Sequence, residues 1–281
     1  MFEAIITAVV AVTAIGLLCA VGLVIASVFM SVKENPLELK VRECLPGVNC
    51  GACGYSGCDG YAKALADNTG VKTNLCTAGG DAVAKQISEV LGTEYESTVE
   101  VVATIRCCGD CSNTEKKTDY SGVNTCAAAK MLHGGDGLCT YGCLGRGDCA
   151  NVCPHDAICM DNGIARVDSR KCIGCGMCAK VCPNELIHMM PDVHRQVISC
   201  HNQQKGAIAR KLCNNACIAC GKCAKECPNE AIIISRNIAK IDYSKCTDCG
   251  KCSKVCPVGC IREADYSGKH RFPDKETILG M

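Results

Sequence analysis

The chain has 281 residues, of which 30 are cysteine, three phenylalanine and none tryptophan, and its formal net charge is +1. So few large aromatic side chains cannot fill the core of a domain of this size, and something other than side-chain packing must hold much of the chain. Cysteine at this level indicates either a disulfide scaffold or a metal protein. Twelve of the cysteines fall in three C-x2-C-x2-C-x3-C-Pro runs, whose regular spacing favours thiolate cages over disulfides.

Bound clusters would change the charge balance, because an oxidised [4Fe–4S] cubane with four thiolates carries a charge of about −2. Six clusters would take the chain from +1 to about −11. The lysines within the cysteine runs are then expected to offset cluster charge. They come without aromatic residues on which bases could stack, so we expect no nucleic-acid partner. These lysines are Lys171, Lys180, Lys222, Lys225, Lys245, Lys251 and Lys254.

Residues 1–33 predict a membrane anchor. Residues 4–30 form 27 positions without a charged side chain, which is long enough to cross a bilayer with some tilt. A secretory signal peptide is the alternative, but it needs a basic start and a shorter apolar run. Lys33, Lys40 and Arg42 follow the span and no Lys or Arg precedes it. The positive-inside rule therefore predicts a single pass through the cell (inner) membrane, with the N-terminus outside and the cluster domains in the cytoplasm.

Residues 34–95 predict a small four-cysteine [4Fe–4S] module. Its ligands are Cys50, Cys53, Cys58 and Cys76. Glycines between the first three cysteines let the backbone fold tightly around a cluster and direct N–H groups at its sulfurs. A structural zinc site is the alternative, since four cysteines also suit tetrahedral zinc. The ferredoxin-type cysteine runs that follow favour an iron–sulfur cluster over zinc in this module. Cys44 lies just outside the motif and has no assigned role.

Two copies of one cysteine pattern follow. The first copy runs from Cys149 to Cys182 and the second from Cys223 to Cys256, so that equivalent residue numbers differ by 74, which we call the repeat offset. The match extends beyond cysteine, because IARVD at 164–168 corresponds to IAKID at 238–242. Each copy predicts a ferredoxin-like unit in which a short helix leads into a β-hairpin and a second cysteine run. Such units are held together mainly by their clusters, because metal binding supplies folding free energy.

The fourth cysteine of each ferredoxin run is expected to bind the cluster of the other run. In the second copy, one predicted ligand set comprises Cys217, Cys220, Cys223 and Cys256, and the other comprises Cys246, Cys249, Cys252 and Cys227. The first copy differs from the second at Arg146, which stands at the position equivalent to Cys220. Cys139 is predicted to supply the missing ligand. One set there comprises Cys139, Cys143, Cys149 and Cys182, and the other comprises Cys172, Cys175, Cys178 and Cys153.

A sixth set is predicted from the cysteines that remain. The repeat offset also pairs Cys126 with Cys200 and Cys139 with Cys213. The ferredoxin clusters do not need Cys213, so a further set of four can form from Cys107, Cys126, Cys200 and Cys213. Cys111 is the alternative to Cys107, and the competing interpretation is that these are buried thiols without metal. No metal-binding role is assigned to Cys108, Cys159 and Cys260.

The sequence therefore predicts an α+β protein in five segments. They are a transmembrane anchor over 1–33, a four-cysteine [4Fe–4S] module over 34–95, a connecting segment that contributes cluster ligands over 96–138, and two tandem bacterial-ferredoxin-like 2[4Fe–4S] modules over 139–190 and 191–281, the second with a tail. No strand–Gly-x-Gly-x-x-Gly–helix unit occurs, and no Ser/His/Asp or carboxylate constellation has persuasive spacing. We therefore expect five or six [4Fe–4S] clusters and one-electron transfer, with no catalytic residue and no nicotinamide or flavin site in this chain.

The order of these motifs resembles that of one known family. The uncharged N-terminal helix, the Cys50-x2-Cys53-Gly54-x3-Cys58 run, the Cys139-x3-Cys143-Leu144-Gly145 run and the serial ferredoxin runs resemble RnfB, the iron–sulfur B subunit of the Rnf complex. The resemblance covers essentially the whole chain. It implies a subunit that accepts electrons from soluble reduced ferredoxin and passes them to the other membrane and peripheral subunits. It also implies that this complex is a translocase, which reduces NAD⁺ and moves Na⁺ or H⁺ across the membrane.

Two other functions stay open from the sequence. One is an iron–sulfur wire subunit of another membrane oxidoreductase, such as a hydrogenase or a dehydrogenase. The other is a membrane-tethered iron–sulfur sensor without through-flow of electrons. A sensor needs only one or two clusters, so five or six in series favour electron transfer.

Overall fold

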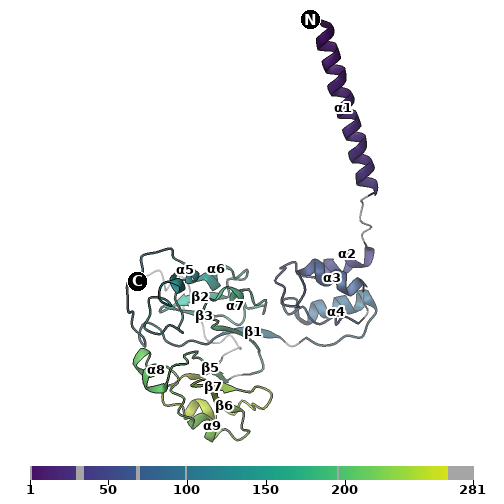
Figure 1. The fold of residues 1–281 in the computed structure, drawn as a ribbon. Helices are drawn as coiled ribbons and strands as arrows, with labels where there is room; N and C mark the ends of the chain where they lie inside the picture. Colours follow the sequence, from purple (N-terminus) through teal and green to yellow (C-terminus); the bar gives the residue numbers. More distant parts are fainter. Residues whose placement is uncertain (1, 30–34, 68–69, 99, 195, 265–281) are drawn as a thin grey trace.

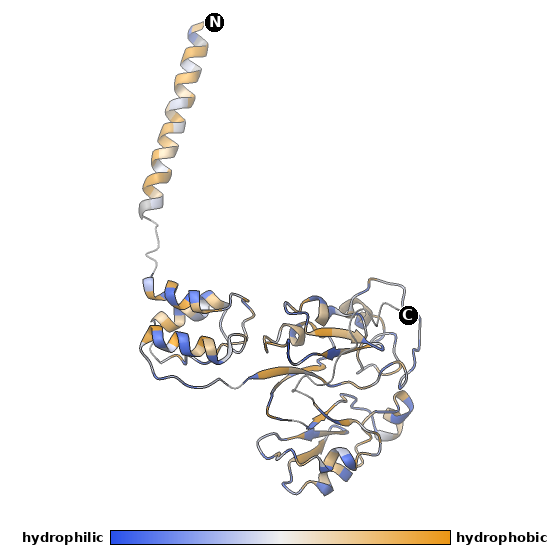
Figure 2. Cartoon of the chain, turned by 180° about the vertical axis from the view of Figure 1, so that it is seen from behind, coloured by the Kyte–Doolittle hydropathy of each residue, from blue (hydrophilic) through white to orange (hydrophobic). Residues whose placement is uncertain are grey.

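The structure is a computed structural model of the chain, described for residues 2–29, 35–67, 70–98, 100–194 and 196–264. Its first element, α1 (Phe2–Phe29), extends away from the rest of the molecule (Figure 1). Within it, Ile5–Ser27 is long and apolar enough to cross a membrane by length and composition. Figure 2 shows α1 in hydrophobic colours along most of its length, and its described side chains are all exposed. The Thr13 hydroxyl bonds back to the Val9 carbonyl at 2.9 Å, which satisfies this polar group without water.

Three helices form a small N-terminal module beside α1: α2 (Pro36–Cys44), α3 (Cys58–Asp67) and α4 (Gly80–Leu91). The side chain of Asn35 accepts the N–H of Leu37 and caps α2, with proline in the first helical position. The three helices bury Val41, Tyr61 and Ile87 between them, and all three side chains are at most 1% exposed. This module therefore has a conventional apolar core.

The first ferredoxin module is built on two antiparallel strand pairs. β2 (Ile158–Asp161) and β3 (Ile164–Val167) form a hairpin. Its turn residues, Asn162 and Gly163, both have positive φ, as tight hairpin turns require. β1 (Val101–Ile105) pairs with β4 (Ile187–Pro191). The helices of this module are α5 (Cys126–Met131), α6 (Asp148–Asn151) and α7 (Met177–Val181).

The second ferredoxin module repeats this plan. β6 (Ile232–Ser235) and β7 (Ile238–Ile241) form its hairpin, and β5 (Gln196–Ile198) pairs with β8 (Ile261–Glu263). Its helices are α8 (Gly206–Leu212), α9 (Lys222–Glu226) and α10 (Lys251–Lys254). In Figure 1 this module lies at the far end of the molecule from α1.

The outer strand of the first module comes from the segment predicted to be a connection. β1 lies within residues 96–138 and pairs with β4, so part of this segment belongs to the module itself. Ile187 in β4 and Ile261 in β8 are equivalent at the repeat offset, and they pair with Ile105 and Ile198 respectively. The ends of β1 and β5 are therefore equivalent in the fold. Their numbers differ by more than the repeat offset, because the first copy has an insertion after its outer strand.

Candidate iron–sulfur centres

The four cysteines of the N-terminal module lie together at one end of its helices. α3 begins at Cys58, and Cys76 precedes α4. Burial raises the pKa of Cys76, and the charges of Cys58, Cys50 and Cys53 add to this effect because the thiols are close neighbours. We call Cys50, Cys53, Cys58 and Cys76 set A.

The first ferredoxin module brings together two groups of four thiols. One cavity is lined by Cys153, Cys172, Cys175 and Cys178, which we call set B. A second cavity is lined by Cys126, Cys143, Cys149 and Cys182, which we call set C. Set B is the group expected from cross-ligation, whereas set C contains Cys126 where the sequence predicted Cys139.

Local contacts explain why set C contains Cys126 and not the predicted Cys139. At the position where the second module has Cys220, Arg146 forms an ion pair with Asp136 at 2.8 Å and provides no thiol. α5 begins at Cys126, and the Ala127 N–H donates to the Asp148 carboxylate at 3.2 Å, which ties this helix start to the start of α6. Cys126 is thereby placed beside Cys149. Cys139 lies instead in a separate cavity with Cys107, Cys200 and Cys213, so the structure places these two cysteines in other cavities than the ligand sets predicted from the sequence.

The second ferredoxin module holds the two groups expected from cross-ligation. Set D, comprising Cys217, Cys220, Cys223 and Cys256, lines one cavity. Set E comprises Cys227, Cys246, Cys249 and Cys252. Burial raises the pKa of Cys252, and the nearby charges of Cys246 and Cys249 raise it further. Burial also raises the pKa of Cys246, and the nearby charge of Cys227 adds to this effect.

Backbone N–H groups point at the ligand sulfurs in both modules. The N–H of Ala157 donates to Cys153 Sγ, and the equivalent N–H of Ala231 donates to Cys227 Sγ, both at 3.3 Å. The Leu186 N–H donates to Cys182 Sγ at 3.4 Å. Such donors stabilise thiolate over thiol, so they favour the ligand form that iron binds.

The number and type of donors in each set suit a [4Fe–4S] cluster. Among residues 2–29, 35–67, 70–98, 100–194 and 196–264, no three Cys, His, Asp or Glu side chains converge in the way that one metal ion needs. A [4Fe–4S] cubane instead takes each thiolate on a separate iron, which lets four sulfurs stand apart around a cavity. Each of the five sets therefore has the donor type and donor number that a [4Fe–4S] cluster takes.

Neighbouring sets contact one another. Lys180, next to set B, donates its ammonium to the Cys50 carbonyl of set A at 2.6 Å. The Thr77 hydroxyl donates to the Gly174 carbonyl at 3.2 Å across the same boundary. Cys149 of set C lies near enough to Cys178 of set B for this neighbour to contribute to its raised pKa, after burial and the thiols of its own set. Sets A, B and C thus follow one another in space.

Known iron–sulfur families match three parts of the chain. A family described as "Putative Fe-S cluster" matches residues 45–77, a 4Fe-4S binding domain matches 165–188, and a 4Fe-4S dicluster domain matches 216–260. These segments contain set A, part of set B, and sets D and E.

Curated relatives match most of the chain. It is 41% identical over 247 residues to the B subunit of the Na⁺-translocating ferredoxin:NAD⁺ oxidoreductase complex of Acetobacterium woodii, covering 88% of this chain and 74% of the relative. It is 42% identical over 233 residues to the B subunit of the proton-translocating complex of Clostridium ljungdahlii, covering 83% and 82%. The B subunit of an ion-translocating oxidoreductase complex of Methanosarcina acetivorans is 38% identical and covers 82% and 88%. The chain belongs to this family of B subunits.

Cys260 belongs to none of the five sets, but it is buried and contacts set D. Cys260 is 2% exposed, lines the cavity of set D and has its Sγ 3.6 Å from Cys256 Sγ. A hydrogen bond from the Cys260 thiol lowers the pKa of Cys256. The equivalent position beside set C is Leu186, which is also 2% exposed. The spacing of the cysteine runs gave no signal of this contact, but comparison of the two copies at position 260 could have revealed it.

Replacing Cys260 is expected to lower the reduction potential of the set D centre. A donor to the ligand sulfurs favours the more negative, reduced state, so its loss in Cys260→Ala should shift the potential down by about 30–60 mV. Leu186→Cys should raise the potential of the set C centre, and Cys260→Ser, which keeps a donor, should stay near the wild type. EPR-monitored redox titration of the purified chain measures these shifts. Unchanged potentials at unchanged iron content would show that the contact has no electronic effect.

Proposed function

We propose that this chain is the iron–sulfur subunit that accepts electrons from reduced ferredoxin and passes them on within a membrane complex. This complex would reduce NAD⁺ and couple the reaction to Na⁺ or H⁺ translocation. The observation that carries the proposal is the series of contacting four-thiol sets in a member of the B-subunit family. Clusters bound there supply one-electron carriers, and the protein's part is to hold them close together and shield them.

We also propose how the chain is oriented. α1 is the single membrane anchor with the N-terminus outside, and the modules that hold the thiol sets lie on the cytoplasmic side. Support comes from Lys33, Lys40 and Arg42, which follow the span. The N-terminal module lies between α1 and the two ferredoxin modules along the chain (Figure 1). Set A is therefore assigned to the membrane side and sets D and E to the outer end.

The distribution of charge supports docking of ferredoxin at this outer end. Residues 205–264 contain eleven Lys and Arg against five Asp and Glu, a net charge of +6, whereas 35–98 contain five against eight, a net charge of −3. Two clusters at about −2 each would leave the second module still positive. A ferredoxin carries its own thiolate-bound clusters and is correspondingly negative, so opposite charge would steer it to the second module.

The basic side chains of this module gather around exposed cluster ligands. α9 and α10 pack against each other. Lys222, Lys225 and Lys251 are exposed on them, and the described residues pair none of the three with a carboxylate. Cys220 of set D and Cys249 of set E are themselves exposed, and each stands two residues before one of these lysines, Lys222 and Lys251 respectively.

Neutralising this basic surface is expected to slow reduction by ferredoxin. The variant Lys222→Gln/Lys225→Gln/Lys251→Gln should lower the second-order rate constant roughly tenfold at low ionic strength, with the difference shrinking as salt is added. Stopped-flow bleaching of the cluster absorbance on mixing with reduced ferredoxin measures the rate.

A matched variant removes three exposed lysines from the N-terminal module instead: Lys40→Gln/Lys63→Gln/Lys85→Gln. It should react with ferredoxin at the wild-type rate, and dithionite should reduce all three proteins alike. Equal slowing by both triple variants would place docking elsewhere. If ferredoxin reduced none of the proteins, including the wild type, the proposed function itself would be wrong.

A further inference from the structure

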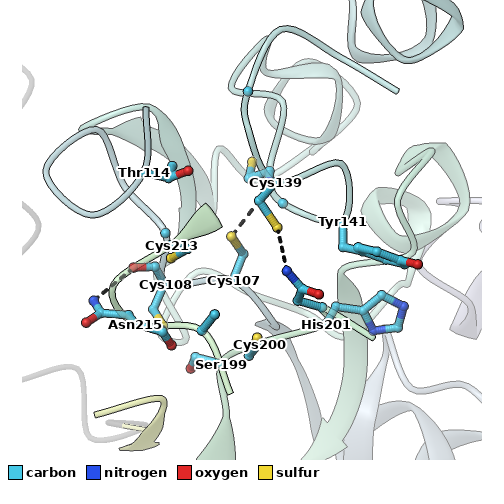
Figure 3. Close-up of a pocket in the computed structure, with 16 residues that line it drawn as sticks. Cys107, Cys108, Thr114, Cys139, Tyr141, Ser199, Cys200, His201, Cys213 and Asn215 are labelled. Atoms are coloured by element: carbon cyan, nitrogen blue, oxygen red, sulfur yellow. Dashed lines mark hydrogen bonds between the residues drawn. The ribbon is translucent and has the colours of Figure 1, made fainter. Parts of the chain in front are cut away.

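A group of four thiols outside sets A to E lines a cavity between the two ferredoxin modules. The cavity has a volume of about 40 Å³ and is also lined by Cys108 and Cys143. Figure 3 shows the labelled members of the group around a common space. The four are Cys107, Cys139, Cys200 and Cys213, which we call the bridging set.

The bridging set consists of two equivalent pairs, one from each module. Cys107 stands two residues after the end of β1, and Cys200 stands two residues after the end of β5. These strand ends are equivalent in the fold, because Ile105 and Ile198 pair with the equivalent strands β4 and β8. Cys139 and Cys213 are equivalent at the repeat offset. Each module thus gives one thiol after its outer strand and one thiol before its first cysteine run.

The hydrogen bonds to these sulfurs follow the same symmetry. The Cys143 N–H donates to Cys107 Sγ at 3.4 Å, and the equivalent Cys217 N–H donates to Cys200 Sγ at 3.3 Å. The side-chain amide of Asn202 also donates to Cys139 Sγ, at 3.4 Å. Donation of N–H groups to buried sulfurs is the pattern seen at the ligands of sets B, C and E.

The equivalent donors also place the bridging set between two other sets. Cys143 belongs to set C and Cys217 to set D, and each bonds to a different thiol of the bridging set. The bridging set is therefore in hydrogen-bond contact with one ligand set of each ferredoxin module.

The neighbouring cysteines are less suited to this cavity. The Cys108 thiol donates to the Asn215 carbonyl at 3.7 Å. Cys111 is exposed, and its backbone N–H bonds to the carbonyl of Asn162 in the β2–β3 turn. Cys126 is a member of set C. Neither Cys108 nor Cys111 has an equivalent cysteine after β5.

We propose that Cys107, Cys139, Cys200 and Cys213 hold a sixth [4Fe–4S] cluster, to which each ferredoxin module contributes two thiolates. This inference rests on the proposed function and deepens it. A cluster whose ligands come from both modules would hold set C of the first module next to set D of the second and so connect the two modules for electron transfer. It also replaces Cys126 by Cys139 in the sixth set.

Double variants distinguish the two groupings by iron content. The full-length chain, purified anaerobically in detergent, should contain about 24 iron atoms. Cys139→Ala/Cys200→Ala should lose one cluster and retain about 20 iron atoms, because both residues belong to the same set. Cys126→Ala/Cys200→Ala should lose two clusters and retain about 16. Cys107 is left intact because the adjacent Cys108 could replace it, and Cys108→Ala is the control that should keep all the iron.

Two results would overturn the inference. The first is the reverse pattern, in which the Cys126/Cys200 pair loses one cluster and the Cys139/Cys200 pair loses two. The second is a wild-type content of about 20 iron atoms by chemical analysis and Mössbauer spectroscopy, which needs no variant to fold. In that case ferredoxin would still bleach the remaining clusters and the proposed function would stand. Zinc in place of iron in all the sets would overturn both.

Discussion

Removal of iron is expected to unfold residues 100–264 while the N-terminal module keeps much of its helical structure. The two parts differ in what fills their cores. In the second ferredoxin module and its boundary, seven of the fifteen residues in the buried cluster are cysteine, and the rest are Ala, Ile and Val. Their strands are three to five residues long and form two-stranded sheets, which are marginal alone in water. The clusters must therefore supply most of the folding free energy.

The N-terminal module has more apolar packing of its own. Val41, Leu65 and Ile87 are buried there, and the Tyr61 hydroxyl donates to the Lys72 carbonyl at 2.6 Å. Hydrogen exchange measured before and after anaerobic chelation tests the contrast. Amides of β2, β3, β6 and β7 should lose nearly all protection, whereas those of α3 and α4 should retain part of it. Retained protection in the ferredoxin hairpins would show that these modules fold without iron.

Local sequence patterns were enough to predict the hairpins. Ile158 to Val167 and Ile232 to Ile241 each place apolar residues on both sides of a short turn that contains asparagine, and these patterns depend on neighbours along the chain. The pairing of β1 with β4 joins residues more than eighty positions apart. A five-residue apolar strand does not specify its partner, so β1 was placed in a connecting segment.

The places of Cys126 and Cys139 could not be derived from spacing for a related reason. The repeat offset holds from the first cysteine run onwards, but the insertion after β1 breaks it upstream. Cys126 therefore matches Cys200 in number, whereas Cys107 matches Cys200 in the fold. A turn in which the Gly142 N–H bonds to the Cys139 carbonyl at 3.0 Å separates Cys139 from Cys143, so that Cys143 lines the cavity of set C and Cys139 does not.

Disruption of set A is expected to abolish ferredoxin-driven NAD⁺ reduction by the complex while ferredoxin still reduces the other centres. Set A is the thiol set nearest to α1 along the chain, and Cys50 contacts set B through Lys180. The thiol of Cys76 is buried at 9% exposure among the other ligands of set A. Cys76→Ala should therefore remove about four iron atoms and lower NAD⁺ reduction to background. Bleaching of the remaining clusters by ferredoxin should keep its wild-type rate.

Cys44 offers a matched control in the same module. It packs against the same apolar core, but its thiol donates to the Lys40 carbonyl one helical turn earlier at 3.3 Å. Cys44→Ala should keep the full iron content and the full rate of NAD⁺ reduction. If Cys76→Ala instead prevented ferredoxin from reducing any centre, electrons would enter at set A and the proposed direction would be reversed. If Cys76→Ala lost iron but still supported NAD⁺ reduction at the wild-type rate, set A would lie outside the electron path, and the contact between Cys50 and Lys180 would serve only to hold the modules together.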